Sequence, residues 1–487
     1  MTFVSDLEPR TLFRQFDAIL ATPRPSTREA AMRRHVIALA ERHGLTWRTD
    51  ATGNLVVVKP ASPGHEAAPT VVLQSHLDMV TEKNSGVSID FDQDPIVPVR
   101  DGDWLKADGT TLGSDNGIGV AAMLALLEAG DVTHGPLELL FTVDEETGLT
   151  GATRLDAQAL ELRGRRLLNL DSEDEGTVTI GCAGGAVTHL RLPLGHQPAP
   201  AGAVTVEARL SGLSGGHSGL DIHLGRGNAV QLLARAVDAA VRGRSAWLAA
   251  FSGGNKHNAI AREARAVVAL APQDRAGFAA AFAQEVAALR AELEGIEPEL
   301  AGEVADAPRA AAIWTQESQE RALGLLLALP HGVLAMSHAI PGLVETSCNL
   351  AAATSDDQAL TVLVSTRSSV ATAMTALRRK IRAAAELAGA EVEEAEGYPA
   401  WQPNVGSPLL SRFRAVHQRV TGKDAELAAV HAGLECGVLG EKLPGMDMIS
   451  FGPDIKGAHS PDERVSIPSV ERFYRLLQET LGDLAAA

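Results

Sequence analysis

The stretch VVLQSHLDMV, residues 71–80, contains an apolar run followed at once by a histidine and an aspartate. The apolar run predicts a buried strand over 71–73. Downstream, the pattern predicts a helix over 118–128 and strands over 137–143 and 167–170. This alternation favours an α/β domain with helices on a mostly parallel sheet. In such sheets, ligands bind beyond the carboxyl ends of the strands.

The rest of the chain predicts a second domain inserted into the first. Residues 12–43 are helical in pattern, with an interruption at Pro23–Pro25. The segment 186–397 combines strands, at 204–210, 267–270 and 360–365, with long helices, at 229–241, 277–293 and 371–387. From 398 the α/β pattern returns, with a strand at 446–451 and a helix at 469–481. We therefore expect a catalytic domain formed by 1–185 and 398–487, and an inserted α+β domain over 186–397.

Composition excludes several classes of function. The 487 residues carry a formal net charge of −18, which disfavours nucleic acid as a partner. The N-terminal region shows no signal-peptide pattern, and no apolar stretch is long enough to cross a bilayer, so we expect a cytoplasmic protein without a membrane partner. The three cysteines, Cys182, Cys348 and Cys436, are far apart, which favours a reducing compartment. A metal site would therefore need histidine and carboxylate ligands.

Five short stretches place such ligands at predicted strand ends or in loops. They are SHLDM with His76 and Asp78, TTLGSDNGIGV with Asp115, FTVDEETG with Glu145 and Glu146, LLNLDSEDEG with Asp171, and GAHSPDE with His459. Each alone is weak evidence, because a single histidine is more often structural, Asp-Asn-Gly is usually a turn or cap, and neighbouring acids such as 173–175 usually form a solvated face. Together they meet the ligand count of two divalent cations that share one carboxylate. Imidazole and carboxylate ligands suit Zn²⁺ best, with Mn²⁺ and Co²⁺ as alternatives.

The order of the motifs resembles the aminoacylase and carboxypeptidase clan of di-zinc peptidases, and within it the aminoacyl-histidine (cytosol nonspecific) dipeptidase family. The resemblance covers nearly the whole chain. Its specific motifs are SHLDMV, DGTTLGSDNGIG, TVDEETGLTGA, LDSEDEGTVTIGCAGG, GGHSG, HAGLECG and GAHSPDERVSIP. The family more often has alanine where this chain has Ser114, a change that precedes a ligand without replacing it.

The resemblance implies a role for each of these residues. It implies that Asp115 bridges two metal ions, with His76 and Asp171 completing one site and Glu146 and His459 completing the other. Asp78 would orient His76 through its other ring nitrogen. Glu145 would be the general base that activates a metal-bound water and later protonates the leaving amine. Adjacent residues of an extended segment point in opposite directions, so one glutamate could bind metal while its neighbour faces the water.

The inserted domain is similar to the lid of this clan. In GGHSG, His217 matches a histidine that supplies a hydrogen bond to the scissile carbonyl oxygen. Judged from the residues alone, GGHSG is explained equally well as a tight turn with no catalytic role. Arg367, in STRSS, resembles a clamp on the C-terminal carboxylate of the substrate, a bidentate task that suits arginine. Asn258, in GGNKHNAI, also lies in the lid as a substrate-binding candidate, and Glu435, in HAGLECG, could meet the free amine.

These observations predict a metal-dependent exopeptidase that cleaves dipeptides, including Xaa-His peptides such as carnosine. One alternative is an N-acyl amino acid deacylase or carboxypeptidase of the same clan. Another is a binding protein on an inactive peptidase fold, which the presence of all five ligands and Glu145 disfavours. The lid could be complete within one chain or pair with a second chain, which leaves a homodimer open.

Overall fold

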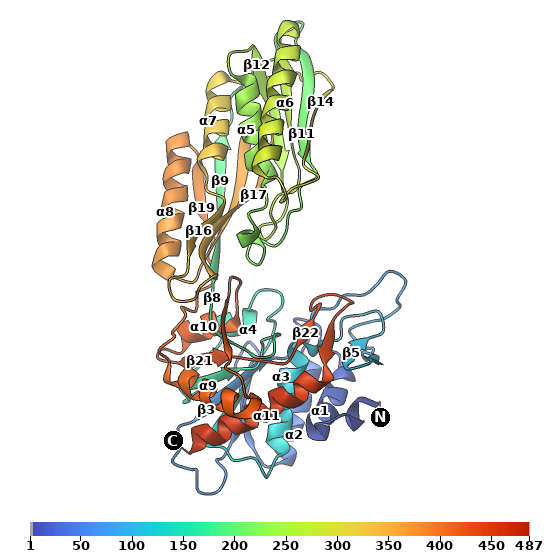
Figure 1. Cartoon of the computed structure of the whole chain (residues 1–487), viewed down its shortest axis with the longest axis vertical. Helices are drawn as coiled ribbons and strands as arrows, with labels where there is room; N and C mark the ends of the chain where they lie inside the picture. The colour runs from blue at the N-terminus through green and yellow to red at the C-terminus, as the bar shows by residue number, and fades with distance from the viewer. Residues whose placement is uncertain (1–2, 487) are drawn as a thin grey trace. The chain divides into compact units, whose positions relative to one another are not determined.

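The computed structural model describes residues 3–486 and divides into two compact units (Figure 1). Unit 1 comprises Met1–Cys182, Trp401–Ala429 and Leu434–Ala487, and unit 2 comprises Ala183–Ala400 with Val430–Gly433. The divisions at 182 and 400 lie three residues from those expected at 185 and 397. The short return of Val430–Gly433 to unit 2 had no signal in the sequence pattern.

Unit 1 is built on an eight-stranded sheet with the order β1-β2-β6-β3-β7-β21-β8-β20. Its strands are β1 (Thr46–Thr49), β2 (Leu55–Lys59), β3 (Val71–His76), β6 (Leu137–Thr142), β7 (Arg166–Asn169), β8 (Thr177–Cys182), β20 (Glu426–Val430) and β21 (Asp447–Ser450). The central strands β6, β3, β7 and β21 are parallel, and β1, β2 and β8 pair antiparallel. The structure thus confirms the predicted α/β class and mostly parallel central sheet. A second sheet, β22-β23-β5-β4, consists of Ile455–Lys456, Arg464–Ser466, Trp104–Ala107 and Pro98–Asp101.

The helices of unit 1 are η1 (Phe3–Asp6), α1 (Arg10–Leu20), α2 (Ala30–Arg42), α3 (Ser114–Glu128), α4 (Thr150–Thr153), α9 (Pro408–Thr421), α10 (Glu435–Lys442) and α11 (Ile467–Ala485). Residues 116–127 of α3 are all buried, so this helix is apolar on every side. It packs on β3 and α1, and α9 packs on β21 and α11. Gly119 permits the close approach of α3, because a Cβ there would lie 2.6 Å from both Leu170 O and Ser75 Oγ. No described helix is both long and apolar enough to span a membrane.

Unit 2 contains an antiparallel sheet with the order β14-β11-β13-β12-β17-β18-β9-β19, and β16 also pairs with β17. The strands are β9 (Gly184–Pro193), β11 (Val204–Ser211), β12 (Ala246–Gly253), β13 (Ala264–Leu270), β14 (Ala301–Asp306), β16 (Gly332–Met336), β17 (Val344–Ser355), β18 (Ala359–Ser368) and β19 (Glu391–Glu394). A separate pair joins β10 (His196–Pro198) to β15 (Ala312–Trp314).

Four helices cover one face of this sheet: α5 (Ala229–Val241), α6 (Arg275–Glu292), α7 (Gln316–Ala328) and α8 (Ala371–Ala388) (Figure 1). Two single turns, η2 (Ile222–Leu224) and η3 (Pro272–Asp274), join the elements. Buried aromatic side chains, including Phe251, Phe278, Phe282 and Trp314, fill the space between helices and sheet. Unit 2 therefore has its own core and the α+β character that the sequence predicted.

Candidate active site

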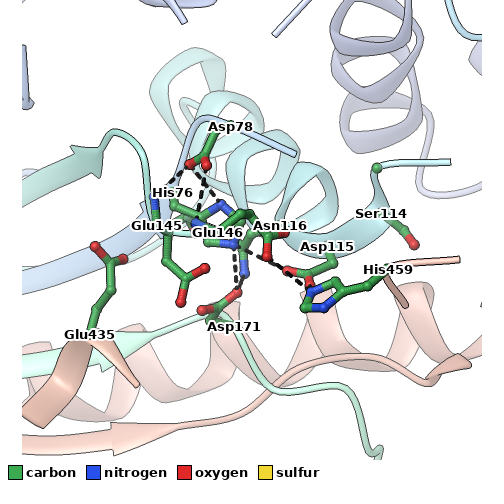
Figure 2. Close-up of polar contacts among 12 residues, drawn as sticks. His76, Asp78, Ser114, Asp115, Asn116, Glu145, Glu146, Asp171, Glu435 and His459 are labelled. Atoms are coloured by element: carbon green, nitrogen blue, oxygen red, sulfur yellow. Dashed lines mark hydrogen bonds and ion pairs between the residues drawn. The ribbon is translucent and has the colours of Figure 1, made fainter. Parts of the chain in front are cut away.

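The carboxyl ends of the parallel strands in unit 1 carry a compact cluster of imidazoles and carboxylates (Figure 2). Asp115 is central, because its two oxygens face different histidines: Oδ1 lies 3.1 Å from His76 Nε2, and Oδ2 lies 3.1 Å from His459 Nε2. His76 ends β3, Asp115 precedes the regular part of α3, and His459 lies in the loop after β22. Segments far apart in the sequence thus meet at one carboxylate.

Asp171 and Glu146 complete two overlapping groups around Asp115. Asp171 Oδ1 lies 3.4 Å from His76 Nε2, and Glu146 Oε2 lies 3.0 Å from His459 Nε2. The ligand atoms of His76, Asp115 and Asp171 all lie within 4.8 Å of one another, as do those of Asp115, Glu146 and His459. Glu146 Oε1 is buried without a hydrogen-bond partner among the described residues. These donor sets fit two divalent cations that share Asp115.

The charges of the cluster favour a positive partner. Burial alone would lower the pKa of His76, but the Asp171, Asp115 and Asp78 carboxylates hold it well above its usual range. Hydrogen bonds to Asp115 and Glu146 raise the pKa of His459 to about 11. The surrounding carboxylates therefore favour the cationic form of both imidazoles when no metal ion is bound. A divalent cation would compete with those protons for the same nitrogen and oxygen atoms.

Asp78 connects His76 to the segment that carries the two glutamates. Its Oδ1 lies 3.3 Å from His76 Nδ1, the ring nitrogen that faces away from Asp115. It also accepts hydrogen bonds from the backbone N–H groups of Glu145 and Glu146, at 3.1 and 3.2 Å. Burial would raise the pKa of Asp78, but the hydrogen bond and charge of His76, with hydrogen bonds from the Glu145 N–H and from Ser26, lower it to about 2. Asp78 is therefore placed to orient a metal ligand and both glutamates.

Glu145 and Glu146 lie in a turn after β6, not in an extended segment as the sequence argument assumed. The turn forms because Asp144 has a positive φ of 52° and the next two N–H groups both bind Asp78. One oxygen of the Glu145 carboxylate lies within 4.8 Å of the ligand atoms of His76 and Glu146. Burial, with the charges of Asp171 and Glu146, holds the pKa of Glu145 well above its usual range against the effect of His76.

Two residues beside the cluster were missed by the sequence analysis. Asn116 donates hydrogen bonds to Leu170 O, at 2.9 Å, and to Asp171 Oδ1, and so orients a ligand. Glu173 was assigned to a solvated face, but it is partly buried. Burial and the charges of Asp115 and Asp171 raise the pKa of Glu173 to about 8. Its neighbours at positions 174 and 175 do pair with surface cations, as expected for a solvated acidic run. The run therefore gave no sign in the sequence that Glu173 is placed differently from them.

Glu435 lies on the Glu145 side of the cluster (Figure 2). It is fully buried at the start of α10, and its Oε2 accepts hydrogen bonds from Gln74 Nε2 and Thr142 Oγ1 at 2.5 and 2.7 Å. Its Oε1 has no partner in the part of the chain that the structure describes. Burial raises the pKa of Glu435 to about 7. A buried oxygen without a donor is suited to a cationic ligand group.

Unit 2 holds a separate group of polar side chains around Arg367, on β18. Arg367 is only 7% exposed and donates one hydrogen bond, from Nη1 to Tyr398 Oη at 2.7 Å. Its Nε has no partner, and no carboxylate within the described range pairs with this guanidinium. A buried unpaired cation is costly, so the site is suited to an anion that the chain itself does not supply.

His217 lies close to Arg367 in the turn that GGHSG forms. Its Nδ1 accepts hydrogen bonds from the N–H groups of Gly219 and Leu220, at 3.2 and 3.0 Å. Burial and the charge of Arg367 lower the pKa of His217, which favours the neutral ring. Since Nδ1 accepts, the proton of the neutral ring is on Nε2, which is then a donor. Gly219 permits this packing, because a Cβ there would clash with the backbone oxygen of His431 and would lie 3.1 Å from His217 Cε1.

Asn258 and His431 lie near the same turn of unit 2. Asn258 is exposed, and its carbonyl oxygen accepts a hydrogen bond from Ser218 N at 2.8 Å, which joins its segment to the His217 turn. His431 was not proposed from the sequence. It is buried, its Nε2 lies 2.7 Å from Ser347 Oγ, and burial and the charge of Arg367 lower the pKa of His431 to about 4. Its position in HAGLECG, four residues before Glu435, was the available signal.

Comparison with known proteins identifies the family of this chain. Residues 72–483 match Peptidase family M20/M25/M40. The chain is 40% identical to the cytosol non-specific dipeptidase of Escherichia coli, over 100% of both chains. It is 41% identical to the crystal structure of aminoacylhistidine dipeptidase from Vibrio alginolyticus, with a TM-score of 0.92 and coverage of 99% and 98%. Aminopeptidase PepT from Bacillus cereus shares the fold, with a TM-score of 0.58 at 16% identity over 98% and 99%. The chain belongs to peptidase family M20/M25/M40.

Proposed function

We propose that this chain hydrolyses dipeptides, with Glu145 as the general base at the Asp115 cluster. The observation that carries the proposal is the position of Glu145 beside the candidate ligands, with a carboxylate oxygen within 4.8 Å of the ligand atoms of His76 and Glu146 and a pKa that burial holds well above its usual range. Two full-length relatives at 40% and 41% identity are named as dipeptidases, which supports the same substrate class here.

His76, Asp115 and Asp171 would hold one divalent ion, and Asp115, Glu146 and His459 the other. Zn²⁺ suits these ligands best, and Mn²⁺ or Co²⁺ are alternatives. When bound, such ions supply positive charge that polarises the scissile carbonyl and makes a water molecule more acidic.

Glu145, Asp78 and His217 would supply the other functions that the reaction needs. Glu145 takes a proton from the attacking water and later delivers it to the leaving amine. A raised pKa, with burial as its main cause, suits a carboxyl group that must both accept and release a proton. Asp78 keeps the neighbouring His76 and the Glu145 backbone in place. His217 would donate from Nε2 to the scissile carbonyl oxygen, where negative charge develops.

The ends of the substrate would be recognised by charge. Arg367 would bind the C-terminal carboxylate, because its buried guanidinium has no anionic partner between residues 3 and 486. Glu435 would bind the free ammonium group through its unpartnered Oε1. Asn258 is a further substrate-binding candidate at the edge of the His217 turn. An N-acyl amino acid lacks the ammonium group and would leave Glu435 unpartnered, so this feature favours a dipeptide over a deacylase substrate.

We also propose a cytosolic location, because the Escherichia coli relative is named a cytosol enzyme and the three cysteines are all free. The described part of the chain contains no disulfide bond.

The test is a panel of free dipeptides, including Xaa-His peptides, with their N-acetyl analogues. Each is assayed after Zn²⁺, Mn²⁺ or Co²⁺ is added to the apo protein. We expect metal-dependent cleavage of free dipeptides and much slower cleavage of the acetylated forms. Glu145→Gln should keep its metals and lose about 10²–10⁴-fold in kcat. Near-normal turnover by metal-loaded Glu145→Gln, or preference for the acetylated substrates, would contradict the proposal.

A further inference from the structure

Glu463 lies four residues after His459 and is the buried end of its loop. It is 2% exposed, whereas the His459 side chain is 55% exposed. A turn joins the two, since Glu463 N donates to Ser460 O at 3.0 Å and Ser460 Oγ donates to Gly457 O at 2.7 Å. A metal ligand on an exposed loop must be held in place by other contacts of that loop. Glu463 is the buried carboxylate of this loop that can make such contacts.

The Glu463 carboxylate accepts its hydrogen bonds from the segment that carries Asp115. Oε2 accepts from the N–H groups of Leu112 and Gly113, at 2.8 and 2.9 Å. Oε1 accepts from Ser114 N at 2.7 Å, from Ser114 Oγ at 2.6 Å and, at 3.3 Å, from Asp115 N. One buried carboxylate thus holds consecutive backbone donors that lead directly into the central aspartate.

Arg24 holds the same segment from another direction. It is 3% exposed, and its guanidinium donates to the carbonyl oxygens of Leu77, Asp78 and Gly113. Gly113 is therefore held at its N–H by Glu463 and at its carbonyl oxygen by Arg24. Arg24 thus holds the Asp115 segment against the end of the His76–Asp78 strand, and Glu463 holds the same segment against the His459 loop.

We propose that Glu463 is a positioning residue that sets the affinity of the Asp115–Glu146–His459 site for its metal ion. It does so by holding the His459 loop at a fixed distance from Asp115. The His76–Asp115–Asp171 site depends less on it, because β3, β7 and Arg24 already position those ligands. This inference rests on the proposed two-metal function, and it concerns a residue that neither binds metal nor touches substrate.

The experiment measures metal binding directly. Apo protein is titrated with Zn²⁺ in competition with a chromogenic chelator, which yields two dissociation constants. We expect Glu463→Gln to raise one of the two Zn²⁺ dissociation constants by about 10- to 100-fold, the range for residues that orient metal ligands. The other dissociation constant should change little. In a His459→Ala background, where that site is already lost, adding Glu463→Gln should have little further effect on the remaining step.

The matched control is Glu138→Gln. Glu138 is also a buried carboxylate of unit 1 that accepts backbone hydrogen bonds, from Arg163 and Gly164, but it lies in the first half of β6, remote from the cluster. We expect this variant to lower the melting temperature and leave both dissociation constants unchanged. Ser114→Ala removes a single hydroxyl donor and should weaken the same step as Glu463→Gln by a smaller factor, about threefold or more.

Two results would overturn the inference: unchanged dissociation constants in folded Glu463→Gln, or equal weakening of both steps. If Glu463→Gln does not fold, Ser114→Ala decides, and unchanged constants in that variant overturn the inference. A wild type that binds fewer than two Zn²⁺ ions would instead contradict the proposed two-metal function, which separates the two failures.

Discussion

Replacing Arg367 with alanine should change which chemical form of a dipeptide the enzyme prefers. The guanidinium is 7% exposed and its only described hydrogen bond goes to Tyr398 Oη, so its charge has no anionic partner within the described chain. We expect the C-terminal carboxylate of the substrate to be that partner. A C-terminal amide keeps the shape of the dipeptide and removes the charge, which isolates the contribution of this one interaction.

The magnitude follows from the burial of the group. Truncating one partner of a buried, hydrogen-bonded charge pair costs about 2–5 kcal/mol. At about 1.36 kcal/mol for each factor of ten, kcat/KM for the free dipeptide should fall roughly 30- to 5,000-fold in Arg367→Ala. The same substitution should change kcat/KM for the amide much less, because the amide never had the charge interaction. The acid-to-amide ratio should therefore be large in the wild type and fall sharply in the variant.

The assay is steady-state hydrolysis of one dipeptide and its amide by wild type, Arg367→Ala and Arg367→Lys. The lysine variant keeps the charge without the planar fork and should give an intermediate ratio. Arg378→Ala is a suitable control, since Arg378 is a half-buried arginine of unit 2 that binds the Ala395 carbonyl and Glu394. It should affect stability and leave the acid-to-amide ratio unchanged. Equal rates on acid and amide in the wild type, or an unchanged ratio in folded Arg367→Ala, would refute the reasoning.

Three further expectations follow from the same geometry. Asp115→Ala should lose both metal ions in elemental analysis, whereas Asp78→Ala should weaken metal binding or activity only about 10- to 100-fold; two ions retained by Asp115→Ala would refute the bridging role. His217→Ala should lower kcat about 10²-fold or more, with metal content intact and KM changed much less, whereas a purely structural turn histidine would alter the melting temperature and spare kcat. Burial lowers the pKa of both His331 and His431 from 6.5 to about 4, so the contribution of these two histidines to the free energy of unfolding should fall as the pH drops from 6.5 toward 4, opposite to that of groups with a raised pKa such as His459 and Glu173. The difference in free energy of unfolding between wild type and His331→Gln, measured by denaturant titration at pH 7 and 5, isolates the contribution of His331 and should shift in favour of the variant at pH 5; the same difference at both pH values would exclude His331 as a contributor.

Hydrophobic periodicity predicted helices and strands well where one face of the element, or the whole element, is buried. The helix expected over 229–241 is α5, Ala229–Val241, because one apolar face packs on the unit 2 sheet. The strand at 137–143 is β6, whose residues are all buried. The candidate ligands that follow these strands lie close together, because parallel strands end at the same edge of a sheet.

Long-range hydrogen bonds account for what the sequence could not predict. Glu463 binds donors about 350 positions away along the chain, and no spacing rule links such residues. Asn116 and Glu173 were hidden for a different reason, since an Asp-Asn-Gly turn and an acidic run both have common structural explanations. The orientation of Glu145 and Glu146 depends on a turn held by Asp78, so the alternation of an extended strand did not apply.

Two buried, incompletely paired side chains bear directly on the proposed choice of substrate. Glu435, in unit 1, and Arg367, in unit 2, each leave a buried polar atom without a partner in the described chain. A free dipeptide carries one ammonium and one carboxylate group whatever its side chains are. The roles proposed for these two residues would select a peptide by its ends, and side chains would then contribute only the smaller energies of apolar contact. Blocking either end should therefore cost far more than exchanging one side chain for another, and the dipeptide panel should show broad tolerance of sequence with steep losses for acetylated and amidated substrates.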